Sequence, residues 1–478
     1  MSRIFDTDVQ SLKHKVLTAI AKSAYHDTLV EDCYAIPKQI IPGPKPTCRC
    51  CIYKERAIVQ ERIALALGGD KNIKNVVEVI KIACDECPVS GYYVSDRCRG
   101  CIAHNCQKAC HKGAISFSST TRQAIIDKTK CINCGMCAKA CQYNAILNNQ
   151  RPCEMACKVK AISMGEDLAA TIDDEKCIHC GACVYTCPFG AIMDKSYITD
   201  VIKVLRANKK NNQSNVYAIV APSIASSYKT SSIGKVVSAI KALGFHAIVE
   251  AALGADMVSY HETRELHEKK LLTSSCCPAF VDLIKKNYPS LTNVMSSSLS
   301  PMATIGKYIK ENDPKAITVF IGPCVAKKAE ALKEEVKPYI NFVLTFEELE
   351  AMFDAKEIDI NVLEESSLDN ASYFGRIFAR SGGLSASISQ SLKEQNIDFE
   401  VKGVVGDGVD NCKLLLNKIK NPQSDINFVE GMACPNGCIG GPCSLSHSLV
   451  DKNVIDRYGK ESKEQTIKDA ISSFIDEE

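Results

Sequence analysis

The chain has 478 residues, of which 46% are hydrophobic and 24% charged, so it is long enough for two or three domains of ordinary globular composition. Its 58 Lys and Arg residues nearly balance its 56 Asp and Glu residues, which excludes the broad basic surface that nucleic-acid binding needs. No apolar run approaches the length of a membrane-spanning helix, so we expect no membrane span.

Cysteine is the unusual component of this composition. Of 27 cysteines, 20 lie in residues 1–187, none in 188–275 and seven in 276–443. Residues 1–25 mix Asp and Lys with apolar positions, which is typical of an amphipathic helix and not of a secretory signal. We therefore expect a cytoplasmic protein with reduced thiols, in which dense cysteine indicates metal binding and not disulfides. The step in cysteine content near residue 190 predicts a domain boundary.

Residues 1–90 are expected to form a helical segment that contains cysteines. The Pro-rich stretch at 37–46 is typical of a linker. A helical pattern then follows three closely spaced cysteines, Cys48, Cys50 and Cys51. These thiols could share a metal site with Cys84 and Cys87, or they could be ordinary free thiols, and the sequence favours neither hypothesis.

Residues 91–195 contain one unit repeated with variation. The copies begin near Cys98, Cys131, Cys153 and Cys177, the third is truncated, and each ends in a Cys, three residues and Ala-Ile. The spacing C-x2-C-x2-C-x3-C lets three thiolates converge on one 4Fe-4S cluster while the fourth points toward a neighbouring cluster. Zinc sites use two Cys pairs instead. We therefore expect an α+β ferredoxin-like domain with iron–sulfur clusters.

This domain offers enough ligands for at least three 4Fe-4S clusters. The candidate ligands are Cys98, Cys101, Cys106, Cys110, Cys131, Cys134, Cys137, Cys141, Cys153, Cys157, Cys177, Cys180, Cys183 and Cys187. Resemblance to a two-cluster ferredoxin with an insert would join Cys187 to the Cys131 segment and Cys141 to the Cys177 segment. The Cys98 segment could instead pair with the Cys131 segment, which would change these crossed ligands. With Cys84 and Cys87 included, the cysteines would suffice for four clusters.

Residues 215–445 alternate short apolar strands with amphipathic helices, which predicts an α/β domain with largely parallel sheets. The expected strands cover residues 216–222, 246–252, 316–323, 341–345, 401–408 and 426–434. Ligands of such sheets gather outside the carboxyl ends of the strands. Three loops there supply thiols for one further 4Fe-4S cluster, namely Cys277, Cys324, Cys434 and Cys438. Residues 446–478 are expected to form an amphipathic helical tail.

The three loops contain T-S-S-C-C-P, P-C-V-A-K-K-A-E and E-G-M-A-C-P-N-G-C-I-G-G. They resemble the signature motifs of the FeFe hydrogenases, in the same order and behind a ferredoxin-like domain. The Cys-rich N-terminus and the Gly-Pro-Cys of the second motif resemble the group B branch. The resemblance implies reversible H2 oxidation and proton reduction at an H-cluster, which is a 4Fe-4S cubane joined through Cys438 to a two-iron unit with CO, cyanide and a bridging dithiolate.

The same resemblance implies partners and residue roles. Electrons would pass through the N-terminal clusters to ferredoxin or flavodoxin, and maturation enzymes would insert the two-iron unit. Lys327 would hydrogen-bond a cyanide, Glu330 would orient that lysine, and Cys276 would exchange protons with the two-iron unit. The proton relay beyond Cys276 would use Glu262, Glu265, Lys269 and Ser296. The residues that enclose the two-iron unit would be Ala221, Pro222, Ser223, Phe378 and Met432.

Simpler hypotheses accompany these roles. Glu265 and Lys269 are spaced as a helix-surface ion pair, and Cys276 could be an inert buried thiol. Cys412 and Cys443 are expected to be structural. As alternatives to a hydrogenase we consider an iron–sulfur assembly protein, a hydrogen sensor of low turnover and a multi-cluster electron carrier.

Some residues depart from the family pattern. Gly322 stands where a methionine is usual, Met302 where many members have glutamine and Lys269 where arginine is usual, and the third motif ends in Gly-Gly-Pro-Cys. None of these positions is an expected ligand, so the cofactor should still bind. They affect the expected rate and direction of catalysis and the expected tolerance of oxygen.

Overall fold

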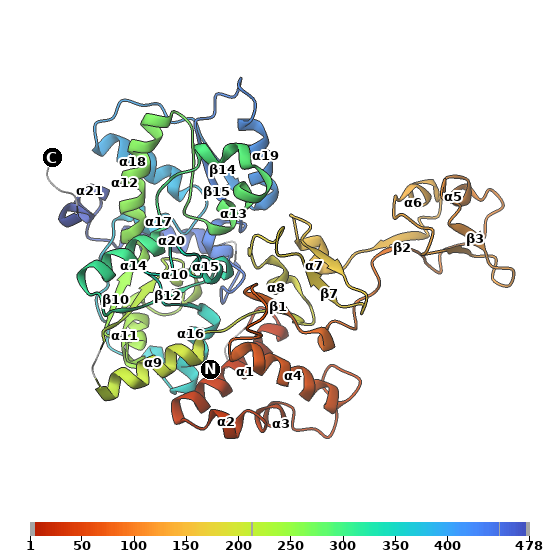
Figure 1. Ribbon diagram of the computed structural model, residues 1–478, viewed down its shortest axis with the longest axis horizontal. Helices are drawn as coiled ribbons and strands as arrows, with labels where there is room; N and C mark the ends of the chain where they lie inside the picture. Colours follow the sequence, from red (N-terminus) through yellow and green to blue (C-terminus); the bar gives the residue numbers. More distant parts are fainter. Residues whose placement is uncertain (1–4, 212–213, 449, 475–478) are drawn as a thin grey trace.

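The computed structural model describes residues 5–211, 214–448 and 450–474. A large body of helices and sheets carries the first helices on one side and a cysteine-rich arm that extends away from it (Figure 1). The first helices are α1 (Asp8–His26), α2 (Leu29–Asp32), α3 (Ile36–Ile40) and α4 (Ile52–Ala66). The helix expected over residues 1–25 begins at Asp8, after the Thr7 side chain accepts a hydrogen bond from the Gln10 N–H; residues 1–4 lie outside the described part.

One expectation for this segment is wrong. The linker expected at 37–46 is partly helical, because Pro37 stands in the first turn of α3, where its missing N–H loses no helical hydrogen bond.

The cysteine-rich arm consists of antiparallel strand pairs with short helices between them. The pairs are β1 (Val77–Val79) with β8 (Ile192–Asp194), β2 (Gly91–Val94) with β5 (Ile146–Asn149), β3 (Ile115–Phe117) with β4 (Ala124–Ile126), and β6 (Ile162–Met164) with β7 (Ala170–Ile172). The helices are η1 (Lys81–Ala83), α5 (Asn105–Lys108), α6 (Met136–Ala140), α7 (Pro152–Ala156) and α8 (Ala182–Thr186). Short helices between antiparallel strand pairs are the expected α+β arrangement. The isoleucine of every Ala-Ile pair begins a strand and is buried.

Two parallel sheets form the centre of the large body. The first has the order β10 (Ala247–Glu250), β9 (Val216–Val220), β12 (Ile317–Gly322) and β13 (Phe342–Thr345). The second has the order β11 (Leu272–Thr273), β15 (Phe428–Met432) and β14 (Gly403–Asp407). The six expected strands are confirmed. Strand β11 was not expected, because two residues are too short for a recognisable apolar pattern.

Helices cover both sheets. They are α9 (Ile198–Asn211), α10 (Ile224–Ser227), α11 (Ile233–Leu243), α12 (Ala251–Lys269), α13 (Pro278–Asn287), η2 (Pro289–Val294), α14 (Pro301–Asn312), α15 (Val325–Glu330), α16 (Phe346–Ala355), η3 (Ile360–Val362), α17 (Tyr373–Ile377), α18 (Gly383–Glu394), α19 (Val409–Ile419) and η4 (Gly437–Gly440). The main core joins α1, α4 and α9 to the first sheet, so the N-terminal helices and the large body share one apolar interior. Among the described residues, no helix combines the length and the apolarity needed to cross a bilayer.

The tail is not the single helix that was expected. It forms α20 (Asp451–Lys460), α21 (Ile467–Ala470) and η5 (Ser472–Phe474), and residues 475–478 lie outside the described part. The chain turns after α20 because the Ser462 hydroxyl donates to the carbonyl oxygens of Gly459 and Glu464. Thr466 then caps α21.

Candidate functional site

Four cysteines lie on loops that follow strands of the parallel sheets. Cys324 follows β12 and directly precedes α15, while Cys434 follows β15. Cys277 lies between β11 and α13, and Cys438 lies in η4. Cys277, Cys324 and Cys434 thus occupy the region beyond a strand's carboxyl end, where α/β folds place their ligands.

The four thiols are close enough to affect each other's ionisation. Burial raises the pKa of Cys324 to about 12, and the thiols of Cys277 and Cys438 add to this rise. Burial, together with the thiols of the other three, also raises the pKa of Cys434 well above its ordinary value. Thiolates side by side in a partly buried site need a cation to neutralise them, and the iron of a 4Fe-4S cluster supplies that charge. The donor set therefore fits a cubane cluster.

A small cavity of about 70 Å³, partly open to solvent, adjoins these thiols. Cys438, Cys276 and Lys327 line it, one from each of the three motif loops. The five residues expected to enclose a bound group also line it, namely Ala221, Pro222, Ser223, Phe378 and Met432. Cys438, which lines the cavity, is the residue that would hold a two-iron unit there.

Packing explains two departures from the family pattern. A Cβ atom on Gly322 would lie 2.6 Å from the ring of Phe320, which itself lines the cavity. The Phe320 ring therefore occupies the space that a side chain at residue 322 would need. Met302 is 1% exposed and also lines the cavity, where its thioether presents a largely apolar surface in place of an amide.

Lys327 brings a positive charge to the cavity. Its Nζ donates to Glu330 Oε2 at 2.7 Å and to the Cys276 carbonyl oxygen at 3.4 Å. Burial opposes the charge, but Glu330 and the Cys324 thiol outweigh burial and raise the pKa of Lys327. Since Lys327 and Glu330 lie one turn apart on α15, the helix itself orients the ammonium group. A buried ammonium of this kind can donate to an anionic ligand.

Polar side chains lie behind Cys276. Glu262 on α12 is completely buried, and its Oε1 accepts from the N–H and the hydroxyl of Ser275 at 3.4 Å each. Burial raises the pKa of Glu262 to about 7, while the nearby hydroxyl of Ser296 opposes this rise. A carboxyl group with a pKa near 7 can both accept and release a proton at neutral pH.

Glu265 and Lys269 continue this row along α12 toward the surface. Their side chains form an ion pair at 2.7 Å and are 13% and 35% exposed. Glu265 also accepts from the Ser297 N–H, and Lys269 donates to the Met295 carbonyl oxygen at 3.2 Å. The four expected relay residues are thus neighbours, and the helix-surface ion pair that was the simpler hypothesis is present as well.

The cysteines of the arm form four groups. We name them the Cys98 group (Cys98, Cys101, Cys106, Cys141), the Cys110 group (Cys110, Cys131, Cys134, Cys137), the Cys84 group (Cys84, Cys87, Cys153, Cys187) and the Cys157 group (Cys157, Cys177, Cys180, Cys183). Each group has four thiols, as a 4Fe-4S cluster needs. Neighbouring thiols affect the pKa in all four groups, after the larger effect of burial.

These groups support the second of the two expected pairings, in which the Cys98 segment pairs with the Cys131 segment, and not the pairing of a two-cluster ferredoxin with an insert. Cys187 does not join the Cys131 segment but lies with Cys153, while Cys141 lies with Cys106. The Cys98 and Cys131 segments exchange their last cysteines, and so do the Cys153 and Cys177 segments. Cys84 and Cys87 complete the truncated third repeat. They are therefore not available for the alternative metal site with Cys48, Cys50 and Cys51.

The repeated Ala of each unit has a defined contact. The N–H of Ala114, Ala145, Ala161 and Ala191 donates to the sulfur of the cysteine four residues earlier, at 3.3, 3.4, 3.1 and 3.3 Å. Such N–H···S bonds stabilise thiolate charge and tune the potential of a bound cluster.

The Cys157 group reaches the large body. Gly181 has a φ of +76°, and a Cβ there would lie 2.6 Å from Pro442 and 2.9 Å from Val325. Cys180 and Cys434 line the same crevice. After the larger effect of burial, the Cys180 thiol helps to raise the pKa of Cys434, and the Cys277 thiol helps to raise the pKa of Cys180. Glycine is therefore required where the arm meets the third motif loop.

Comparison with known proteins agrees with this geometry. Residues 214–442 match the model of the iron only hydrogenase large subunit, C-terminal domain, and residues 124–147 and 170–193 match the 4Fe-4S binding domain. Residues 214–442 belong to the iron-only hydrogenase family. The arm before this hydrogenase domain carries the 4Fe-4S binding domains.

Relatives of this hydrogenase domain include two named hydrogenases. Iron hydrogenase 1 of Clostridium pasteurianum is 30% identical over 377 residues, which are 67% of this chain and 64% of the relative. The periplasmic Fe hydrogenase large subunit of Nitratidesulfovibrio vulgaris is 29% identical over 376 residues, 66% of this chain and 85% of the relative. The chain thus spans less than two thirds of the first relative's length. The cytosolic Fe-S cluster assembly factor narfl of Danio rerio is 24% identical over 322 residues, 53% of this chain and 78% of the relative.

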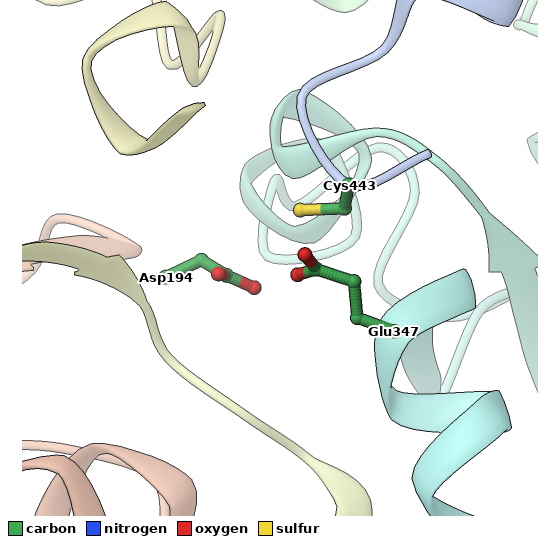
Figure 2. Close-up of side chains that lie close together, drawn as sticks. All are labelled: Asp194, Glu347 and Cys443. Carbon is green, nitrogen blue, oxygen red and sulfur yellow. The ribbon is translucent and has the colours of Figure 1, made fainter. Parts of the chain in front are cut away.

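A buried charge junction lies where α1, the arm and the hydrogenase domain meet. Figure 2 shows Asp194, Glu347 and Cys443 pointing toward one another from three separate segments. Lys13 Nζ bonds both carboxylates, at 2.6 Å to Asp194 and 2.5 Å to Glu347. Lys328 Nζ bonds Asp194 at 2.7 Å. Because ammonium groups already neutralise these carboxylates, the cluster is an ionic contact and not a metal site.

Sequence reasoning missed this junction. Its members lie far apart in the chain, and no short motif joins them. Burial opposes a charged Asp194, but Lys13 and Lys328 outweigh it and lower its pKa. Cys443 is completely buried beside the junction, and the Cys412 thiol donates to the Gly406 carbonyl oxygen at 3.3 Å, so both have the structural surroundings expected.

Proposed function

We propose that the chain interconverts hydrogen gas with protons and electrons at an H-cluster. The observation that carries this proposal is a set of four partly buried thiols next to a cavity that a charged lysine lines. Cys277, Cys324, Cys434 and Cys438 would hold the cubane. When bound, the two-iron unit would supply the Lewis-acidic metal chemistry that heterolytic activation of H2 needs.

The side chains around the cavity have separate tasks in this proposal. Lys327 donates a charge-assisted hydrogen bond to a cyanide of the two-iron unit, and Glu330 holds the ammonium group in that direction. Cys276, an S–H group at neutral pH, would release its proton to the Glu262 carboxylate and take up a proton from the cavity in its place. Ser296, Glu265 and Lys269 then lead the proton to the exposed end of α12. General acid–base transfer of this kind requires groups within reach of one another.

Electrons leave by a different route. The Cys157 group lies next to the H-cluster loops, and the other groups extend from it through the Cys84 group to the arm's far end. We propose four accessory 4Fe-4S clusters, one in each group. A chain of clusters keeps every tunnelling step short, whereas protons need titratable side chains, so the two charges are separated.

The far end of the arm has the charge that an acidic electron carrier would recognise. Residues 91–150 contain eight Lys and Arg residues against two Asp and Glu residues, an excess of six, and all eight basic residues are exposed. Exposed apolar side chains lie among them, with Ile102 98% and Tyr143 52% exposed. Figure 1 shows this part, with α5 and α6, projecting from the body. We propose that it binds ferredoxin or flavodoxin, which steering by opposite charge would favour.

Two further assignments belong to this proposal. The group B branch is supported by the Cys-rich N-terminal residues and by the Gly-Pro-Cys at Cys324. A cytoplasmic location is supported by the 27 cysteines, which need a reducing compartment. The relative from Nitratidesulfovibrio vulgaris is named periplasmic, so fractionation of the native host would test the location directly.

An assembly role is the second candidate, because the relative from Danio rerio is named an assembly factor. Such a protein needs cluster thiols but no partners for a two-iron unit. Here the cavity is lined by Cys276, Lys327 and Met432, and Glu330 accepts a hydrogen bond from Lys327. The presence of these residues favours the hydrogenase.

Infrared spectroscopy of protein matured without oxygen tests the proposal. We expect bands of iron-bound CO and cyanide, together with hydrogen-dependent reduction of a dye. A protein that contains its full iron but shows neither the bands nor turnover after maturation would be an assembly protein or carrier, and the proposal would be wrong. Protein expressed without the maturation enzymes should contain the cubane and remain inactive.

A further inference from the structure

Arginines surround the Cys84 group. Arg62 and Arg151 are 2% and 1% exposed, and both are among the largest fully buried side chains of the described residues. Arg49, whose side chain is 4% exposed, lies beside them and pairs with Asp85 at 3.5 Å and Glu86 at 3.6 Å. Arg49 is therefore neutralised by two carboxylates, whereas the other two arginines have different surroundings.

Arg62 is a buried cation without a carboxylate partner among the described residues. It donates to the Phe189 carbonyl oxygen at 2.9 Å and to the Met193 sulfur at 3.1 Å, while its Nε has no hydrogen-bond partner there. Burial lowers the pKa of Arg62 to about 10, and the thiols of Cys187 and Cys48 act in the opposite direction. Its guanidinium thus bonds the backbone two residues after Cys187 and interacts electrostatically with that thiol of the Cys84 group.

Arg151 approaches the same group from the other side. Its Nη1 lies 3.9 Å from the sulfur of Cys84, and its Nε donates to the Pro88 carbonyl oxygen at 3.1 Å. No ion pair of Arg151 occurs within the described ranges. A buried guanidinium without a counter-ion is unfavourable, so both arginines need an anion that the side chains alone do not provide.

A 4Fe-4S cluster with four thiolates is such an anion, and reduction adds one more negative charge to it. Arg62 and Arg151 would stabilise that added charge strongly, because little water screens a charge in a buried site. We propose that these two arginines give the cluster of the Cys84 group the highest reduction potential of the four accessory clusters. It would then hold one electron, taken from H2 or from the reduced carrier, midway along the chain.

The other groups lack comparable buried cations among the described residues. Near the Cys157 group, Lys286 donates to the Cys177 carbonyl oxygen but is exposed, and His179 already faces Asp282 at 3.4 Å. The basic residues around the Cys98 and Cys110 groups are exposed and therefore screened by solvent and salt. The inference rests on the proposed four-cluster assignment and adds an order of potentials to it.

The test is a redox titration of the full chain, with its clusters reconstituted, followed by electron paramagnetic resonance. The first cluster to be reduced should disappear in a Cys84→Ala/Cys153→Ala double variant, with loss of about four iron atoms per chain. Arg62→Met and Arg151→Met should each lower the equilibrium constant for reduction of that cluster at least tenfold. For one electron this equals a fall of 59 mV in its midpoint potential. Arg62→Lys, which keeps the charge, should change this midpoint potential less. Lys286→Met removes an exposed cation beside another group and should change it little.

The outcomes separate this inference from the proposed function. If the double variant keeps its full iron content, the ligand assignment is wrong. If it loses one cluster but retains the signal of highest potential, the ligands stand and the inference is overturned. Unchanged midpoints in Arg62→Met and Arg151→Met with unchanged iron content would overturn it as well. If either arginine variant loses iron, its midpoint potential cannot be compared with the wild type. The test is then whether the signal of highest potential disappears in the Cys84→Ala/Cys153→Ala double variant.

Discussion

Cys276 and Glu262 are electrostatically coupled in the interior: burial raises the pKa of the Cys276 thiol, and the Glu262 carboxyl group is the next largest cause of that rise. Cys276 lines the cavity, while Glu262 is completely buried behind it on α12. The pair therefore connects the cavity to a helix whose far end carries Glu265 and Lys269. A proton that leaves the cavity would pass between these two groups.

Glu262→Gln should stop proton transfer and change the dependence of stability on pH. The pKa of Glu262 is raised to about 7 in the folded chain, from an ordinary value of 4.5. Its protonation therefore stabilises the fold below about pH 4.5, and this contribution, about 3 kcal/mol, is lost as the pH rises through about 7. Calorimetric melting temperatures at pH 5 and pH 8 should show Glu262→Gln gaining on the wild type at the higher pH. An equal difference at both values would contradict the assignment.

Cys276→Ala should keep the infrared bands of a matured enzyme and reduce turnover by orders of magnitude, because the cavity remains while its proton acceptor is gone. The matched control is Cys412→Ala, since Cys412 is also a buried free thiol but bonds only backbone carbonyl groups. The control should retain most of its turnover. Near-normal turnover in Cys276→Ala would remove that residue from the proton path.

Gly322→Met should destabilise the cavity wall, because its Cβ would lie 2.6 Å from the Phe320 ring. Overpacking of this kind costs about 1–3 kcal/mol. Adding Phe320→Ala should recover part of that loss, since the two side chains compete for one space, and a double-mutant cycle of unfolding free energies would measure the coupling. Purely additive effects would show that the two positions are independent.

Lys13→Met should weaken the attachment of α1. It would leave Asp194 and Glu347 with less neutralisation inside the junction, and removing one partner of a buried pair costs about 3–5 kcal/mol. Lys15→Met is the control, because Lys15 lies on the same helix but is exposed. Limited proteolysis should release the N-terminal helices faster in Lys13→Met only. Equal protection of both variants would argue that the junction adds no stability.

Charge reversal on the arm should weaken binding of an acidic carrier. Lys108→Glu with Lys139→Glu removes two exposed basic residues from α5 and α6. We expect KM for a ferredoxin to rise and to depend less on salt, with unchanged turnover when a small dye supplies electrons. Lys337→Glu, an exposed lysine of the large body, is the control. An unchanged KM would exclude the arm's basic surface as the docking site.

The sequence alone was sufficient for the chemical class and for the two kinds of domain. Cluster ligands must be cysteines at short, regular intervals, so the repeats and the loops around Cys277, Cys324 and Cys434 are visible in the linear chain. The parallel strands are visible because buried apolar runs alternate with helices.

Only the tertiary structure decided which segments share a cluster. Cys84 and Cys187 are about a hundred residues apart, and nothing local in the chain pairs them. The same holds for Lys13 with Glu347, and for the Phe320 ring that takes the space at Gly322. Such contacts depend on long-range packing, which brings together side chains whose individual patterns carry no signal, whereas motif ligands are constrained locally by the geometry of the loop that holds them.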